Sequence, residues 1–180
     1  PKEIGCAPEF LQWLTDPVLN GGGAIIDFGC YGADIMTWLM DGKKPISVTA
    51  VTQQLKPDVY PKVDDEASII LTYPDCQAII QASWNWPFDR KDTEVYGTKG
   101  ILVADKTNKM RYVTGDRFGQ EGMLSLEPLP HDVSNVFPYL AAVVQGRIKP
   151  QKDLSSFAIN QVVVEILEAA RESAKTGKKV

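Results

Sequence analysis

The chain has 180 residues and a formal net charge of −4; hydrophobic residues make up 44% of it and charged residues 23%. This length suits one domain with a core large enough to need no disulfides, and the composition is typical of a globular protein. The lysines and arginines are scattered, which argues against a nucleic-acid partner and against an acidic membrane surface. No apolar run is long enough for a membrane-spanning helix.

The cysteines and the histidine argue against a metal site. Cys6, Cys30 and Cys76 are too few and too widely spaced for zinc, and their odd number does not indicate a disulfide framework. His131 is the only histidine, so a multi-histidine site is excluded, and we expect its role to be structural. We expect no metal and a reduced, cytoplasmic setting. The sequence shows no signal peptide, but it begins at Pro1 rather than at methionine, which is compatible with a fragment.

A short helix is predicted over residues 9–14 and is stopped by Asp16-Pro17. The run Gly21–Gly23 follows and opens a longer helix that extends to about Met40, with Gly42 as its cap. The three glycines form either a turn or a point where a ligand approaches the backbone closely. The second alternative arises because free N–H groups at the start of a helix favour negative charge.

Asp27, Tyr31 and Asp34 are the strongly polar side chains of this longer helix, which is otherwise apolar. At about 100° per residue they fall on one narrow stripe. A helix that is apolar on nearly all sides is expected to be buried, and buried carboxylates need partners. The stripe is therefore either a hydrogen-bonded structural cluster, the more common outcome, or one wall of a pocket. To transfer protons near neutral pH, Tyr31 needs a nearby cation, which this helix lacks.

Alternating apolar and polar residues predict a series of strands. The most regular are residues 66–73 and 76–86, joined by a turn at 73–76, and a second hairpin is predicted around Gly97–Gly100. Further strands are expected at residues 46–50, 110–114 and 123–127, with a loop at 117–122. Because strand follows strand, the sheet should be mainly antiparallel, with one apolar face for helices and one open face for water or a partner subunit.

Two helices are predicted to close the chain. The first begins near Ser134, which places Pro138 in its first turn, and it ends at Gly146. The second covers residues 155–175, and its inward residues are expected to be Phe157, Val162, Val163, Ile166, Leu167 and Ala170. The expected fold class is α+β: an open-faced, mainly antiparallel sheet with helices packed on one face.

Other residues have a structural and a functional interpretation. The acidic run Asp64–Glu66 is predicted to be a solvated turn rather than a cation site. Trp13 and Trp84 are candidates for contacts with a substrate, and packing is the alternative for both. The chain contains no dinucleotide-binding glycine fingerprint and no P-loop.

The segment GGGAIIDFGCYGADIMTWL, residues 21–39, resembles a motif of general form GGGxxxDxGxHxxD. That motif follows the nucleotide-binding domain in the family of glucose–fructose oxidoreductase, inositol dehydrogenase and MocA-type oxidoreductases. The resemblance extends to Trp13 with Asp16-Pro17, to Asp65–Ser68 at the start of a strand and to the closing stretch Ser173–Lys178. It covers essentially the whole chain.

The resemblance implies that residues 1–180 are the C-terminal substrate and oligomerisation domain of a two-domain oxidoreductase, whose N-terminal Rossmann domain is absent from this chain. NAD or NADP would be bound mainly by that domain, with Gly22 and Gly23 as contacts here. Tyr31 and Asp27 would be catalytic, and a lysine of the other domain would supply the missing cation. The substrate would contact Asp34, Trp13 and Trp84.

The substrate class and the partners follow from the same resemblance. Many members carry histidine where this chain has Tyr31, and tyrosine there is similar to the glucose–fructose oxidoreductase and dihydrodiol dehydrogenase branch. The expected substrate is a sugar, polyol or related diol that loses hydrogen from a CH–OH group. A homo-oligomer formed through the open sheet face is expected, and the isolated chain should be inactive. The alternative is a non-catalytic binding or oligomerisation module.

Overall fold

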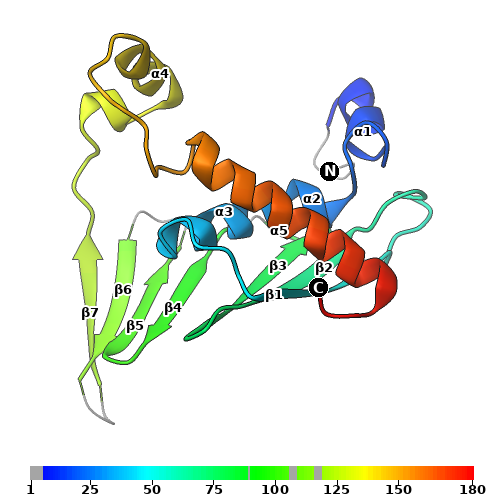
Figure 1. The fold of residues 1–180 in the computed structure, drawn as a ribbon, viewed down its shortest axis with the longest axis horizontal. Coiled ribbons are helices and arrows are strands. Elements are labelled where there is room, and N and C mark those ends of the chain that lie inside the picture. Colours follow the sequence, from blue (N-terminus) through cyan, green and yellow to red (C-terminus); the bar gives the residue numbers. More distant parts are fainter. Residues whose placement is uncertain (1–5, 89, 106–108, 116–118) are drawn as a thin grey trace. The chain divides into compact units, whose positions relative to one another are not determined.

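The computed structural model describes residues 6–88, 90–105, 109–115 and 119–180, and it divides into two compact units. The first unit combines Pro1–Asn85 with Pro150–Val180, and the second is Trp86–Lys149. Both contain antiparallel strands and helices, so the predicted α+β class is confirmed (Figure 1). The strands form two sheets, of three and of four strands. Pro87, which has no N–H for a strand ladder, stands between the two groups of strands.

The first unit is built on the sheet β1 (Ser47–Gln53), β2 (Glu66–Thr72) and β3 (Gln77–Ser83), in that order. Both pairings are antiparallel, and Ile69 of β2 lies opposite Ala50 of β1 and Ile80 of β3. The turn between β2 and β3 closes with a hydrogen bond from the Tyr73 amide to the Cys76 carbonyl, at 2.9 Å. The predicted hairpin is therefore confirmed.

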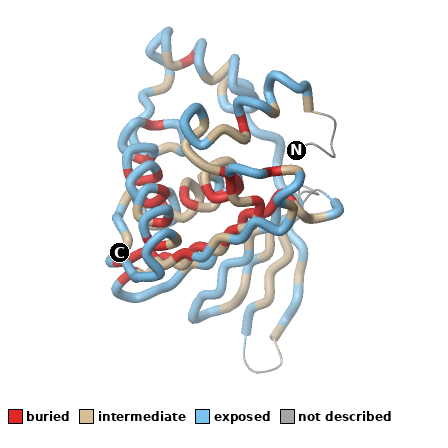
Figure 2. Tube along the Cα trace, turned by 90° about the vertical axis from the view of Figure 1, so that its right-hand side faces the viewer, coloured by how far each residue is buried: buried red, intermediate tan, exposed pale blue. Residues whose placement is uncertain are grey.

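Helices cover one face of this sheet: α2 (Ala24–Asp27), α3 (Gly29–Leu39) and α5 (Phe157–Thr176). Helix α1 (Pro8–Leu14) instead packs through Leu14 in a separate cluster with Ala24, Tyr60, Val63 and Trp84. The long helix α5 packs on β1 and α3, and its buried residues lie on the side that faces the sheet (Figures 1 and 2). Five of the six residues predicted to point inward are buried, as expected. The sixth, Phe157, is 82% exposed because it begins the helix, so that part of the prediction is wrong.

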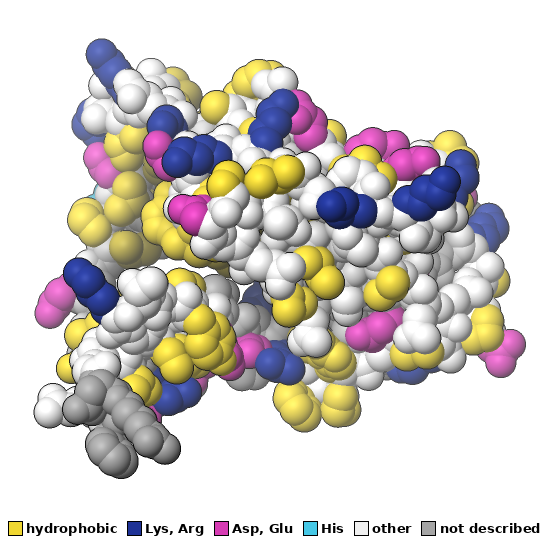
Figure 3. Space-filling model, turned by 60° about the horizontal axis from the view of Figure 1, so that its bottom comes forward, with side chains coloured by type: hydrophobic (Ala, Val, Ile, Leu, Met, Phe, Trp, Pro, Cys, Tyr) yellow, Lys and Arg dark blue, Asp and Glu magenta, His cyan; other side chains and the backbone are white. Residues whose placement is uncertain are grey.

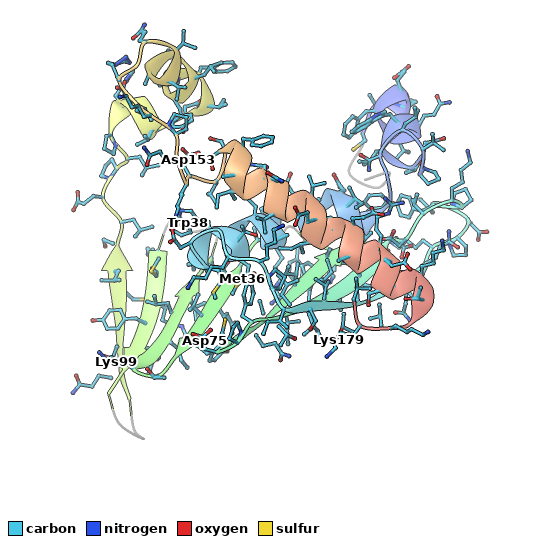
Figure 4. All side chains as sticks on the ribbon, viewed as in Figure 1. Met36, Trp38, Asp75, Lys99, Asp153 and Lys179 are labelled. Atoms are coloured by element: carbon cyan, nitrogen blue, oxygen red, sulfur yellow. The ribbon has the colours of Figure 1, made fainter. Side chains whose placement is uncertain are left out.

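The predicted single helix over residues 21–40 is divided at Phe28, although the backbone there stays in the right-handed helical region (φ −106°, ψ −28°). Its buried residues within α3 are Gly29, Ala33 and Thr37, a stripe of small side chains. The expectation of burial on nearly all sides is wrong, because this small-residue stripe makes the close contact. Met36 packs against the core, whereas Trp38, on the opposite side of α3, is 49% exposed (Figure 4).

The second unit contains β4 (Thr93–Gly97), β5 (Gly100–Ala104), β6 (Lys109–Thr114) and β7 (Gln120–Ser125), paired antiparallel in chain order. The predicted hairpin around Gly97–Gly100 is confirmed. Of the predicted loop at 117–122, residues 117 and 118 lie outside the described residues, and 120–122 belong to β7 instead. After the turn η2 (His131–Val133), α4 (Val136–Val144) has Asn135 as its N-cap and Pro138 in its first turn, as predicted.

The second unit has almost no core of its own. Among its described residues only Ala142 is buried. Helix α4 exposes a row of large apolar side chains, Val136, Phe137, Leu140 and Val144. Helical spacing therefore identified an apolar face here, but the described residues do not cover it.

The acidic run Asp64–Glu66 is not a solvated turn, so that prediction is wrong. The Asp64 carboxylate accepts hydrogen bonds from the amides of Gly23 (3.1 Å) and Ile25 (2.7 Å), and its carbonyl accepts one from the amide of Ala24 (3.0 Å). Asp64 thus caps the start of α2 from a distant loop, satisfying N–H groups that a helix start leaves unpaired. The next residue, Asp65, is fully buried.

We predict that Gly23→Ala lowers the free energy of unfolding by more than about 2 kcal/mol. A Cβ at this position would lie 1.8 Å from the Asp64 carbonyl oxygen, which is backbone and cannot move aside alone. Gly22→Ala is the matched control, because the nearest atom to its Cβ would be Ile26 Cγ1, at 2.7 Å, on a side chain that can rotate. Urea unfolding of both variants checks this. Equal losses would contradict the close approach of Asp64 to Gly23.

Candidate functional site

Three polar side chains lie on successive turns of the helical segment α2–α3. Asp27 is the last residue of α2, and Tyr31 and Asp34 follow on α3. Because the backbone stays helical through Phe28, residues four and seven positions after Asp27 lie on its side of the helix. The three side chains therefore lie on one side of the helical segment, as the sequence predicted.

Tyr31 is the most accessible of the three. Its side chain is 55% exposed, and its ring lies beside that of Phe28, with 6.3 Å between ring centroids. A phenol that is exposed to this degree can be reached by a molecule outside the chain. Tyr31 is therefore not sealed inside the apolar core.

Asp27 is half-buried and fixed by a tryptophan. Its Oδ2 accepts a hydrogen bond from Trp84 Nε1, at 2.9 Å. Burial raises the pKa of the Asp27 carboxyl, because a buried charge loses its hydration, and the hydrogen bond from Trp84 opposes that rise. Oδ1 accepts no hydrogen bond from the residues that the structure describes.

Asp34 has an unused acceptor. Its Oδ1 is buried and accepts no hydrogen bond within the described part of the chain. Burial raises the pKa of this carboxyl. Because buried polar atoms are nearly always paired in folded proteins, this oxygen is a candidate to accept a hydrogen bond from a bound hydroxyl group.

Trp84 does not offer an open ring face to a substrate. It is 5% exposed and packs in a small cluster with Leu14, Ala24, Tyr60 and Val63, so the alternative of packing is confirmed, while a contact of Trp84 with the substrate stays a prediction. The alternation along β3 already placed residue 84 in phase with the buried side chains. The hydrogen bond to Asp27 was missed, because no local pattern reveals a partner 57 positions away.

The structure places the other predicted site residues, Trp13, Gly22 and Gly23, while their contacts with a ligand stay predictions. Trp13 is 43% exposed on α1, with its ring 5.7 Å from that of Phe10. Gly23 does make a close backbone approach, but the approaching group is Asp64 rather than a ligand, and its amide is already paired. The contact of Gly22 and Gly23 with a cofactor remains a prediction.

Other features of the described residues lie apart from the stripe. A hollow of about 330 Å³ is lined by Gly22, Asp64 and side chains near the end of α5, but by none of the three stripe residues. No group of three His, Cys, Asp or Glu side chains is placed to hold a metal ion in the described ranges. His131 is exposed, with Nδ1 3.3 Å from Asp132 Oδ1. Within the part that the structure describes, no helix combines the length and apolarity needed to cross a membrane.

Comparison with known proteins supplies a family. Residues 5–103, more than half of the chain, match the family described as GFO/IDH/MocA C-terminal domain. The sequence is also similar to trans-1,2-dihydrobenzene-1,2-diol dehydrogenase of Xenopus laevis, with 38% identity over 82 residues. That match covers 46% of this chain and 24% of the Xenopus protein.

Solved structures share the fold. The aldose-aldose oxidoreductase of Caulobacter crescentus, complexed with glycerol, matches with a TM-score of 0.73 and 22% identity over 94% of this chain. GenD2 from gentamicin A biosynthesis, in complex with NAD, matches with a TM-score of 0.67 and 27% identity over 93% of this chain. In each case the match covers 50% of the solved chain.

The matched regions therefore cover about half the length of those solved proteins and about a quarter of the Xenopus protein. The matched family covers the glycine run, the α2–α3 stripe and both hairpins. The named relatives are all oxidoreductases or a protein solved with NAD. The chain belongs to the GFO/IDH/MocA C-terminal domain family, a family of oxidoreductases.

Proposed function

We propose that this chain is the substrate-binding half of an NAD- or NADP-dependent oxidoreductase that acts on a CH–OH group of a sugar, polyol or related diol. The N-terminal Rossmann domain would belong to the same protein but lie outside these 180 residues. The observation that carries the proposal is the exposed phenol of Tyr31, one turn from the half-buried carboxylate of Asp27, in a chain of this family.

The residues of this chain fit the substrate side of such a site. The amides of Gly23, Ala24 and Ile25, which would otherwise attract a pyrophosphate, are taken by Asp64. This arrangement favours a cofactor held mainly by the other domain. A bound nicotinamide would accept the hydride from the substrate carbon or return it.

Tyr31 would move the proton. In the direction of oxidation its phenolate takes the proton of the substrate hydroxyl, and in the reverse direction the phenol returns it to the carbonyl oxygen. A lysine from the other domain would stabilise the phenolate, because a nearby cation lowers the pKa of a tyrosine. Asp27 Oδ1, which accepts no hydrogen bond from the described residues, would orient the hydroxyl or that lysine, and Asp34 Oδ1 would accept a hydrogen bond from another hydroxyl of the substrate.

The substrate class is supported by the relatives. One is a diol dehydrogenase, and another is an aldose-aldose oxidoreductase solved with glycerol. Substrates of this kind carry several hydroxyl groups, and Asp27 and Asp34 offer acceptor oxygens on neighbouring turns of one helical segment.

A second candidate function is a non-catalytic binding or oligomerisation module. The open face of the sheet β1–β3 favours it, because Val51 and Ile79 are 64% and 67% exposed there, and Ile79 lies directly opposite Ile70. On the side brought forward in Figure 3, hydrophobic side chains form small groups among polar ones. We propose that a second copy of the protein packs on this face in either case.

We predict that Tyr31→Phe in the full-length protein lowers kcat by about 100-fold or more while KM changes little, because the proton transfer is lost. Tyr96→Phe is the matched control, since Tyr96 is a 70% exposed tyrosine on β4. Turnover of a panel of sugars and polyols checks this. Unchanged turnover of Tyr31→Phe on a substrate that the wild type uses would contradict the catalytic proposal and favour the module.

We predict that the isolated chain binds neither NADH nor NADPH and has no turnover, because the start of α2 is already occupied by Asp64. Isothermal titration calorimetry of the 180-residue chain with each nucleotide measures this directly. Detectable heat with saturation would contradict the assignment of the cofactor to another domain.

We predict that Ile79→Lys converts the proposed oligomer to a monomer, because a lysine at the centre of a buried interface is left unpaired. Val18→Lys is the matched control, since Val18 is 88% exposed and lies in the loop after α1. Light scattering at several concentrations reports the mass. A wild-type chain that stays monomeric at high concentration removes the proposed interface.

A further inference from the structure

We infer that Trp84 is the positioning residue of the proposed site: its indole N–H holds one oxygen of Asp27 so that the other faces the substrate. The inference rests on the proposed function. In this role Trp84 does not stack on the substrate; it acts through Asp27 as a buried hydrogen-bond donor.

The hydrogen bond has a fixed direction. An indole nitrogen carries one N–H group and can only donate, so Trp84 always presents a donor to Asp27. The distance between Trp84 Nε1 and Asp27 Oδ2 is 2.9 Å, and the two residues come from the end of β3 and the end of α2. A donor paired with a carboxylate favours its ionised form. Trp84 therefore orients the carboxyl group of Asp27 and opposes the rise in its pKa that burial causes.

Trp84 is itself held rigidly. Its ring packs on Tyr60, which is fully buried, with 5.0 Å between ring centroids. Its backbone amide donates to the carbonyl of Asp65, at 2.9 Å. Because the indole is buried and its backbone is tied down, it cannot follow Asp27 to another position. The position of the carboxylate is thus set by the core of the first unit.

Asp65 anchors the residues around Trp84. This fully buried carboxylate accepts hydrogen bonds from the amides of Leu55 (2.8 Å) and Lys56 (2.7 Å) and from Asn85 Nδ2 (3.1 Å). Its carbonyl accepts from both Trp84 and Asn85. The acidic run therefore supports the site twice, since Asp64 caps α2 and Asp65 fixes the segment that carries the indole.

The arrangement leaves Asp27 with one held and one usable oxygen. Oδ2 is taken by Trp84, whereas Oδ1 accepts nothing from the described residues. The neighbouring titratable group, Cys30, donates through Sγ to the Asp27 carbonyl at 3.2 Å, and burial raises the pKa of its thiol. Burial is the largest cause of the raised pKa of Asp27, and the indole N–H of Trp84 is the side-chain donor that opposes this rise.

The test removes the indole N–H group of Trp84 and keeps the shape of its ring system. Site-specific replacement of Trp84 by 3-benzothienylalanine puts sulfur in place of the N–H group, and Trp84→Phe is a second variant made by ordinary mutagenesis. Trp86→Phe is the control, because Trp86 packs on Arg90 in the second unit. Carbon-13 NMR of aspartate carboxyl groups, recorded against pH on the 180-residue chain, reports the pKa of Asp27 without any need for activity.

We expect the pKa of Asp27 to rise in both Trp84 variants and to stay unchanged in Trp86→Phe, because burial raises it and the indole opposes that rise. In the full-length enzyme we expect kcat to fall about tenfold with the benzothienyl side chain, while KM changes little. A pKa of Asp27 that does not change in a folded benzothienyl variant overturns the inference. An unchanged kcat overturns it as well.

Failure of the inference and failure of the proposed function can be told apart. If Tyr31→Phe keeps full turnover while the Asp27 pKa still responds to Trp84, the hydrogen bond stands and the catalytic proposal falls. If Tyr31→Phe is inactive and the pKa of Asp27 is the same in the wild type and in the Trp84 variants, the catalytic proposal stands and the positioning role of Trp84 falls.

Discussion

The contact between Asp64 and the start of α2 determines where the candidate site lies. A helix of four residues has little stability of its own, since it forms few internal hydrogen bonds. Here the carboxylate and the carbonyl of Asp64 bind three consecutive amides, and Gly23 has no side chain to block that approach. Burial raises the pKa of Asp64, and the hydrogen bonds from Ile25 and Gly23 oppose that rise. The glycine run therefore has a structural role, since Gly23 allows Asp64 to approach the start of α2.

Two further contacts fix the positions of Asp27 and of helix α3 relative to the capped start of α2. The indole of Trp84 holds Asp27, and the small residues Gly29 and Gly32 let α3 lie close to the sheet and α5. A Cβ on Gly32 would approach Ile80 to 2.5 Å. Since α3 packs mainly through its small residues, Tyr31, Trp38 and Leu39 on its other sides remain exposed. The packing that stabilises the helix thus also presents the phenol outward.

The second unit exposes large apolar side chains to water. Helix α4 exposes Phe137 and Val144, and the second unit has almost no buried residues among those described. Surfaces of this kind are unfavourable in water unless something covers them.

Local patterns in the sequence predicted the parts of the fold that depend on neighbouring residues. Alternation and turn residues located the hairpin of β2 and β3, and helical spacing located α5 with most of its buried face. They failed where the deciding partner is remote. Asp64 looks like a solvated turn residue until Gly23 and Ile25, 41 and 39 positions away, are seen to donate to it. The stripe of Asp27, Tyr31 and Asp34 was predictable, but the donor that holds Asp27 was not.

The central claim is that Tyr31 and Asp27 form one wall of a substrate site that another domain completes. A crystal structure of the full-length protein with nicotinamide cofactor and a bound polyol tests it most directly. The account predicts Tyr31 Oη within about 2.6–3.2 Å of the substrate oxygen that reacts, and Asp27 Oδ1 turned toward the same substrate or toward a lysine of the other domain. A bound polyol whose reacting carbon lies away from both side chains would contradict it.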